Sequence, residues 1–250
     1  MVAMNQATFK SPDGVLAEAQ SLAALPIGEI GSRLTLLRAH YRAEPLHFTP
    51  QALSLLRQAG ERACNLAAAA NGQRALAALQ EVFGYQDFRA GQMEIIQAVM
   101  AGRDCLAVMP TGAGKSVTYQ IPARLLGGLT LVISPLISLM KDQVDAMTEV
   151  GIRATFLNSS LGAGERSRRE AQLRAGEFEL LYAAPEGIDA SVGWLLDQLD
   201  LKMIAVDEAL HQRMGPRFQA RLSQSRRFEA TLQGHSGAGA DRDRYAARQD

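Results

Sequence analysis

The chain is poor in the features that mark secreted, membrane-spanning or strongly charged proteins. Its two cysteines, Cys64 and Cys105, exclude a disulfide framework and a cysteine-built zinc cluster, and they favour a reducing cytoplasm. Lys plus Arg and Asp plus Glu number 26 each, so any nucleic-acid contact must come from local patches. No apolar run approaches transmembrane length, and the N-terminus lacks a secretory pattern. We therefore expect a cytoplasmic protein without a membrane partner.

The last part of the chain is short of aliphatic residues. Residues 210–250 contain three leucines and neither isoleucine nor valine, while Arg, Gln, Gly and Ser are frequent. Such a composition cannot bury much apolar surface, so disorder is expected there.

The first 80 residues favour helices, and their role is not apparent from the sequence. Thr49-Pro50 is typical of a helix start, with proline at the first helical position. Apolar spacing predicts a helix over 53–70. Asn71-Gly72 is expected to break it before a second helix at 75–82.

Residues 81–209 alternate short apolar runs with amphipathic segments. The expected strands are 105–109, 129–134, 154–157, 178–183 and 203–206. The expected helices are near 115–126, 136–149, 163–175 and 189–199. This alternation predicts an α/β domain with a parallel sheet and helices on both faces.

A glycine-rich segment follows the first expected strand and precedes a helix. It reads Thr111-Gly112-Ala113-Gly114-Lys115-Ser116. Its glycines allow backbone N–H groups to surround a phosphate, and the helix N-terminus adds positive potential. Lys115 is expected to reach the β- and γ-phosphates of ATP, and the Ser116 hydroxyl to ligate Mg²⁺. The strict phosphate-loop pattern would need glycine where Met109 stands, and Thr111-Gly112 supplies the flexibility instead.

Two carboxylates follow the last expected strand. Met203 to Val206 leads directly into Asp207 and Glu208. An acidic pair after a buried strand is the usual Mg²⁺ partner of a phosphate loop. We expect Asp207 to hold the metal and Glu208 to orient and deprotonate the attacking water.

With these motifs in order, residues 81–209 resemble the first, RecA-like motor domain of RecQ-type helicases of superfamily 2. The segment 83–92 is similar to the adenine-recognition motif of that family. The resemblance implies that Gln92 reads the adenine edge, that Arg89 supports it, and that Tyr85 stacks on the base. A glutamine amide suits this role because it both donates and accepts hydrogen bonds.

Further segments are similar to family motifs that touch DNA. They are Ser134 to Gln143, Leu157 to Ser160 and Tyr182 to Glu186. The resemblance implies DNA contacts through hydroxyls, helix N-terminal N–H groups and a lysine. The residues concerned are Ser134, Pro135, Ser138, Lys141, Asn158 and Ser159.

The resemblance stops at Ala209. The family continues its Asp-Glu-Ala motif with histidine, whereas this chain has Leu210 and then unrelated residues. In a shifted frame, residues 211–222 are compatible with the family segment ISEWGHDFRPD, and residues 241–246 with TATAT. We therefore hypothesise a frameshift at codon 210, an out-of-frame tail over 210–250, and loss of the TATAT strand from the sheet.

The resemblance implies ATP-dependent, 3′→5′ unwinding of DNA, with Mg²⁺ as cofactor and single-stranded DNA, or a duplex with a single-stranded end, as partner. Without a second motor domain, we expect this N-terminal fragment to bind ATP and DNA but to unwind little. Two alternatives remain open. One is a non-catalytic nucleotide-binding remnant, and the other is an interaction module formed by residues 1–80.

Overall fold

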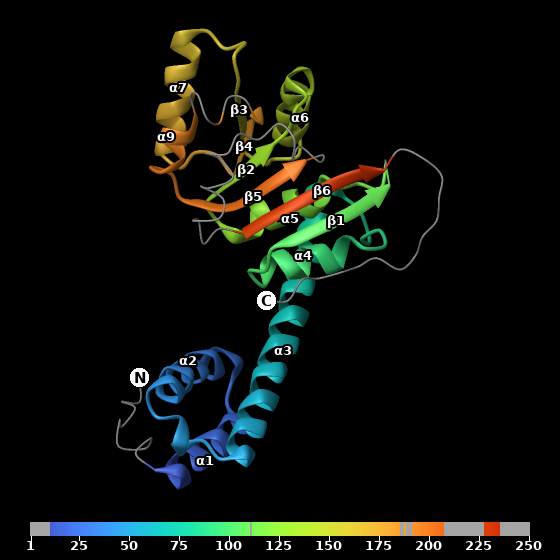
Figure 1. Cartoon of the computed structure of the whole chain (residues 1–250). Coiled ribbons are helices and arrows are strands. Elements are labelled where there is room, and N and C mark those ends of the chain that lie inside the picture. Colours follow the sequence, from blue (N-terminus) through green and yellow to red (C-terminus); the bar gives the residue numbers. More distant parts are fainter. Residues whose placement is uncertain (1–10, 111, 186–187, 189–191, 208–227, 236–250) are drawn as a thin grey trace. The chain divides into compact units, whose positions relative to one another are not determined.

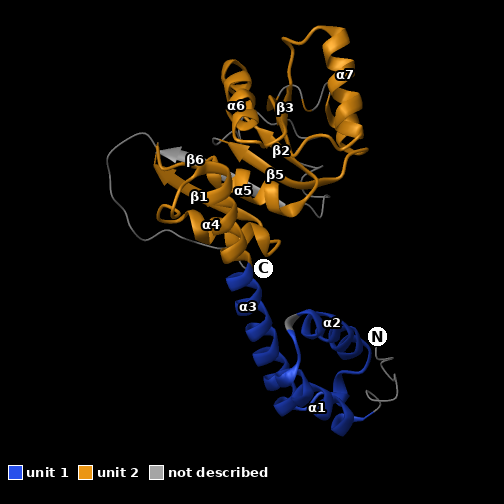
Figure 2. Ribbon diagram, turned by 180° about the vertical axis from the view of Figure 1, so that it is seen from behind, with its two compact units in different colours: residues 1–70 blue, residues 71–250 orange. Residues whose placement is uncertain are grey.

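The chain forms two compact units, divided between Ala70 and Asn71 (Figure 2). The computed structural model describes residues 11–110, 112–185, 188 and 192–207, together with the backbone of 228–235. The division lies ten residues before the boundary at 80 that the sequence suggested, and it falls inside a helix.

The first unit is built from helices with a core of their own. Its helices are α1 (Pro12–Ser21), α2 (Ile27–Ala43) and the start of α3 (Pro50–Phe83) (Figure 1). The Ser11 hydroxyl caps α1 by accepting a hydrogen bond from the Gly14 N–H. Short 3₁₀ turns lie at Leu22–Ala24 and Pro45–His47. Its buried residues are Val15, Ala19, Leu22, Ile30, Leu37, Phe48, Ala52 and Ala59.

Helix α3 runs without interruption through Asn71-Gly72, so the expected break there is wrong. A Cβ on Gly72 would lie 3.1 Å from Nε2 of Gln97 and 3.7 Å from Sδ of Met93, both on helix α4 (Gln92–Met100). Glycine therefore permits the close approach of α4. This packing outweighs the roughly 1 kcal/mol that a glycine costs inside a helix.

The second unit contains a parallel sheet. Its strands are β1 (Cys105–Pro110), β2 (Leu129–Ile133), β3 (Ala154–Leu157), β4 (Leu180–Ala183), β5 (Leu201–Asp207) and β6 (Phe228–His235). They lie in the order β1-β6-β5-β2-β4-β3, and every neighbouring pair is parallel. The α/β fold predicted from alternating apolar and amphipathic segments is confirmed.

Helices cover both faces of this sheet (Figure 1). Helices α4, α5 (Val117–Leu126) and α6 (Ile137–Glu149) contribute to one buried cluster, and α7 (Ala163–Arg174) and α9 (Gly193–Leu196) contribute to the other. Along β4, Leu180 and Tyr182 belong to the first cluster and Leu181 and Ala183 to the second. This alternation follows from the two-residue period of a strand.

Strand β6 differs from the expected disorder of residues 210–250. Its backbone pairs with β1 on one side and with β5 on the other, with Ala230 opposite both Cys105 and Ala205. The gap expected from loss of a strand is therefore filled at 228–235. Backbone hydrogen bonds of a sheet do not depend on side-chain identity, which explains how a segment poor in aliphatic residues can pair here. Residues 208–227 and 236–250 lie outside the described residues.

Within the described part of the chain, no helix is both long enough and apolar enough to span a membrane.

A buried carboxylate ties α5 to the start of β3 and β4. Glu179 Oε1 lies 2.8 Å from Arg124 Nη1, and its Oε2 accepts the Arg153 N–H at 3.0 Å. The side chain of Glu179 is 8% exposed, whereas those of its arginine partners are 38% and 60% exposed. Burial by itself raises the pKa of Glu179, but the Arg153 N–H and the Arg124 guanidinium outweigh burial and hold the pKa below its usual range.

We predict that Glu179→Gln lowers the free energy of unfolding of the second unit by about 1–2 kcal/mol, since its arginine partners are partly solvated. Because the folded-state pKa is depressed, this stabilisation is present at neutral pH and is lost as the pH falls below about 4. Urea unfolding followed by the fluorescence of Trp194, the single tryptophan of the chain, reports on this unit. The exposed Glu149→Gln is the control. Equal stability of both variants at pH 7 would contradict the prediction.

Candidate nucleotide-binding site

The phosphate loop connects the end of β1 to the start of α5. Gly112 and Gly114 have φ of 79° and 75°, a left-handed conformation that glycine adopts without strain. Within the described residues, the N–H groups of Gly114, Lys115 and Ser116 donate to no other group. Together with the N-terminus of α5, these N–H groups form an anion-binding surface. Thr111, also predicted for this loop, lies outside the described residues.

Lys115 lies in the same loop, two residues before α5. Its side chain is partly buried and forms no ion pair with any described residue. The carbonyl of Lys115 accepts the Thr118 hydroxyl at 2.6 Å, which anchors the backbone that carries the lysine. An ammonium and N–H groups that have no partner among the described residues suit a polyphosphate.

Gln92 and Arg89 hold the loop from the other side. The Gln92 amide donates to the carbonyl oxygens of Ala113 at 3.0 Å and Gly114 at 2.9 Å, and its Oε1 accepts the Arg89 N–H at 2.9 Å. The Arg89 guanidinium donates to the carbonyl of Gly112. Gln92 is 3% exposed, so in this arrangement its amide contacts the loop, not an adenine edge. Its expected contact with adenine stays a prediction.

Tyr85 presents an open aromatic face. Its ring is 57% exposed and stacks on Phe83, with centroids 6.1 Å apart and planes 9° from parallel. Phe83 packs against the core of the unit and fixes the position of Tyr85. The exposed side of such a ring can stack on a base.

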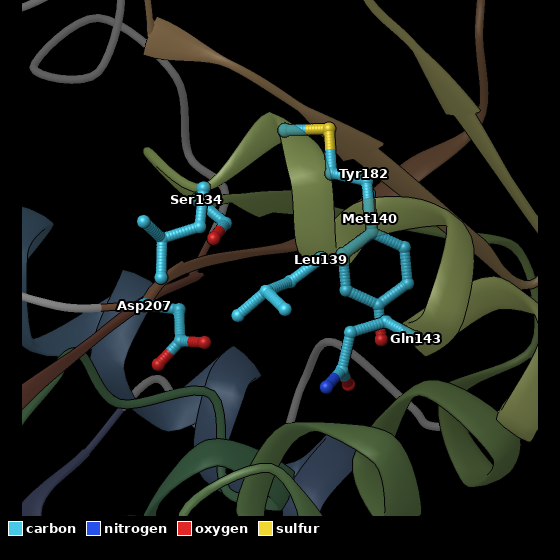
Figure 3. Close-up of a pocket in the computed structure, with 7 residues that line it drawn as sticks. Ser134, Leu139, Met140, Gln143, Tyr182 and Asp207 are labelled. Atoms are coloured by element: carbon cyan, nitrogen blue, oxygen red, sulfur yellow. The ribbon is translucent and has the colours of Figure 1, made fainter.

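Asp207, at the end of β5, lines a pocket of about 100 Å³ with Ser134, which follows β2. Figure 3 shows these two residues on one side of the pocket and Gln143 and Tyr182 on the other. Asp207 and Ser134 come together because parallel strands end at one edge of the sheet. Glu208, expected to act on the attacking water, lies outside the described residues.

Two buried tyrosines lie beneath this edge: Tyr182, the first residue of the motif segment 182–186, and Tyr119, which the sequence did not single out. Tyr119 and Tyr182 are each 1% exposed. Burial raises the pKa of Tyr119 well above its usual value. The neighbouring Tyr182 and Asp207 raise this pKa further, while Ser116 lowers it. Tyr119 thus lies near both Ser116 and Asp207, the two residues predicted to hold Mg²⁺. Its position three residues after Ser116, on one helical face, was the available signal.

The expected DNA-facing residues of α6 and the preceding turn lie at the same edge of the sheet. Ser134 and Pro135 connect β2 to α6, and Ser138 and Lys141 are exposed three residues apart on that helix. Lys141 Nζ lies 2.7 Å from Asp145 Oδ2. An exposed hydroxyl and lysine near a helix N-terminus are suited to phosphate contacts.

Asn158 and Ser159 follow β3 and differ in exposure. Asn158 is 5% exposed, and its Oδ1 accepts the N–H of Ser160 at 3.0 Å and its hydroxyl at 2.6 Å. The Asn158 side chain therefore shapes the turn, and Ser159 beside it is exposed. A direct DNA contact by Asn158 remains a prediction.

The family match and the most similar proteins found by comparison are all helicases. The DEAD/DEAH box helicase family matches residues 89–235. The chain is 50% identical over 138 residues to the ATP-dependent DNA helicase RecQ of Pasteurella multocida (strain Pm70), covering 55% of this chain and 22% of that protein. It is 52% identical over 136 residues to the RecQ of Haemophilus influenzae (strain ATCC 51907 / DSM 11121 / KW20 / Rd), covering 54% and 22%. The chain thus matches about a fifth of the length of these relatives.

Solved structures support the fold. The helicase MrfA, of the DUF1998 type, aligns with a TM-score of 0.52 and 20% identity over 65% of this chain and 29% of its own. MrfA bound to DNA and AMPPNP aligns with a TM-score of 0.52 and 20% identity over 64% and 26%. At this identity the likeness shows a shared fold alone.

We predict that Gly114→Ala impairs nucleotide binding at the loop. The added Cβ would lie 2.7 Å from Gln92 Nε2 at a φ of 75°, so both the loop and the Gln92 contact must shift. Fluorescence titration with a labelled ATP analogue should show an affinity at least about tenfold lower, or ~1.4 kcal/mol. Gly151→Ala is the matched control, since its φ is 79° but nothing lies within 4 Å of the added atom. Equal affinity in both variants would argue against a role of the loop in binding.

Proposed function

Because the chain belongs to the DEAD/DEAH box helicase family and its motor segment is of the RecQ type, we propose that it binds and hydrolyses ATP in response to DNA. The observation that carries the proposal is the phosphate loop at the end of β1, where the N–H groups of Gly114, Lys115 and Ser116 and the Lys115 ammonium have no partner among the described residues. Other proposed site residues lie at the same edge of the sheet.

The proposed catalytic roles are assigned to residues of the loop between β1 and α5 and of the end of β5. Lys115 binds the β- and γ-phosphates, and the loop N–H groups hold their oxygens. The Ser116 hydroxyl and the Asp207 carboxylate would hold Mg²⁺, since hard oxygen donors suit this ion and both lie near Tyr119. When bound, the metal would neutralise part of the phosphate charge. Glu208 orients and deprotonates the attacking water.

Adenine recognition is proposed for the segment that precedes α4. Tyr85 stacks on the base through its exposed face, and Gln92 binds the adenine edge. Since the Gln92 amide donates to the loop carbonyls, binding of adenine requires that side chain to rotate. Arg89, which also donates to the loop, would keep the loop in place during this change.

DNA is the proposed partner, single-stranded or as a duplex with a single-stranded end. The contacts are assigned to Ser134, Pro135, Ser138, Lys141, Asn158 and Ser159, which follow β2 and β3. Their location at the same edge as the phosphate loop supports a link between DNA contact and ATP turnover. A cytoplasmic setting fits this partner.

We predict that DNA stimulates ATP hydrolysis by the 250-residue chain and that Lys115→Ala lowers the stimulated rate by about a hundredfold, or ~2.7 kcal/mol. The lysine acts on phosphate charge, which increases toward the transition state. Phosphate release is measured with and without a single-stranded oligonucleotide. Arg168→Ala is the control, because it removes an exposed cation from α7, on the other face of the sheet.

We propose that strand separation by this chain is little or absent. Unwinding of a labelled duplex by the purified chain would overturn that expectation. DNA-independent ATP binding without turnover would instead favour a non-catalytic nucleotide-binding remnant.

The departure from the RecQ-type motif pattern after Ala209 is proposed to be a frameshift at codon 210. Shifted-frame compatibility with two family segments in the right order supports it. The nucleotide sequence across codons 205–215 tests this directly. If restoring one frame there does not yield the family's continuation, the hypothesis fails.

An interaction module in the N-terminal residues is the second candidate function. The separate core of residues 11–70 favours it, because a unit with its own buried cluster can present a surface independently of the motor. A pull-down with residues 1–80 addresses this candidate.

A further inference from the structure

The first unit carries a surface groove between α2 and α3. Its volume is about 310 Å³. It is lined by Leu34, Leu37, Arg38, Tyr41, Arg42, Phe48, Leu53, Leu56 and Arg57. All of these residues belong to the unit that ends at Ala70, so the groove is a property of that unit alone.

The lining residues of α2 follow one face of the helix. They occur at Leu34, Leu37, Arg38, Tyr41 and Arg42, spacings of three and four residues. The leucines are buried or partly buried, whereas Tyr41 is 44% exposed and the arginines are exposed. The groove thus has an apolar floor and a polar edge on this side.

Helix α3 and the segment before it complete the groove with the same chemistry. Leu53, Leu56 and Arg57 lie on one face of α3, and Phe48 precedes that helix. Phe48 packs edge-on against Tyr41, with centroids 5.0 Å apart. An arginine on α3 therefore faces the same groove as the two on α2.

These arginines have no counter-charge among the described residues. No carboxylate lines the groove, and within the described residues Arg38, Arg42 and Arg57 form neither an ion pair nor a hydrogen bond through their side chains. In the same unit, by contrast, Arg33 pairs with Glu18 at 2.6 Å and Arg62 donates to the carbonyl of Ala23. Unpaired cations around an apolar floor are complementary to a ligand that carries both acidic and apolar groups.

We propose that this groove binds an acidic amphipathic helix of a partner protein. Leucine or phenylalanine side chains at helical spacing would occupy the floor, and flanking Asp or Glu would pair with Arg38, Arg42 and Arg57. A nucleic-acid strand is less well matched, because phosphate contacts do not require the five apolar floor residues. The proposal is independent of ATP or DNA binding by the second unit.

The test uses a labelled peptide of about fifteen residues, with Leu or Phe at i, i+3, i+7 and i+10 and Glu or Asp on the flanking positions. Fluorescence anisotropy with the full 250-residue chain measures its affinity. We expect binding that weakens with salt, since exposed ion pairs are screened. A peptide with serine at the apolar positions should bind at least about tenfold more weakly.

A protein variant provides the second half of the test. Arg38→Glu with Arg42→Glu should weaken acidic-peptide binding by at least about tenfold, and a peptide with lysine in place of its acidic residues should gain affinity for this variant. Arg103→Glu with Arg168→Glu makes the same charge change in the second unit and should leave binding unchanged. Circular dichroism verifies that each variant is folded, and the peptide changes test the groove without altering the protein.

Several outcomes would overturn the proposal. They are absence of peptide binding, equal binding of the serine peptide, and no effect of the charge reversal at Arg38 and Arg42. Loss of oligonucleotide binding in that variant, without loss of peptide binding, would assign the arginines to nucleic acid. Concentration-dependent self-association abolished by the same variant would assign the groove to a second copy. Lys115→Ala should leave peptide affinity unchanged, which separates this proposal from the ATPase.

Discussion

Parallel pairing of the strands is the constraint on which the second unit depends. Because each strand must return through a crossover, every strand from β1 to β5 ends at the same edge of the sheet. That edge receives the phosphate loop after β1, Ser134 after β2 and Asp207 at the end of β5. Ser134 and Asp207, far apart in the chain, line one pocket for this reason.

The site is supported by contacts that lie behind its functional groups. On one side, Arg89 and Gln92 donate hydrogen bonds to the carbonyl oxygens of the phosphate loop. On the other, Tyr119 and Tyr182 lie beneath Ser116 and Asp207. The residues proposed to bind adenine thus also control the shape of the loop proposed to bind phosphate. Nucleotide binding would therefore rearrange hydrogen bonds already present in this structure.

The two units differ in how their arginines are paired. In the second unit, cationic groups such as Arg124 and Arg153 are paired with Glu179 and hold the structure together. In the first, Arg38, Arg42 and Arg57 surround an apolar groove and form no ion pair with any residue that the structure describes. A chain with no net charge can therefore present a local basic surface, because charge is distributed unevenly among its elements.

Much of the motor segment could be predicted from local pattern. Buried parallel strands are continuous apolar runs, so Leu129 to Ile133 and Leu180 to Ala183 were recognisable, as was the glycine-rich loop after β1. Local pattern failed at Gly72, where packing of α4 decides that a helix continues. It also failed at 228–235, where two open strand edges provide partners for a segment with little apolar character.

The sequence by itself determined the alternation of helices with the strands from β1 to β5 and the glycine-rich loop after β1, because these depend on neighbours within one or two turns of chain. The roles of the site residues stay predictions. Only the tertiary structure decided that Gln92 contacts the loop carbonyls, that Asn158 is used within its own turn, and that two tyrosines lie beneath the site. It alone brought the arginines of α2 and α3 to one groove. Such contacts depend on which distant surfaces meet, and no local spacing specifies that.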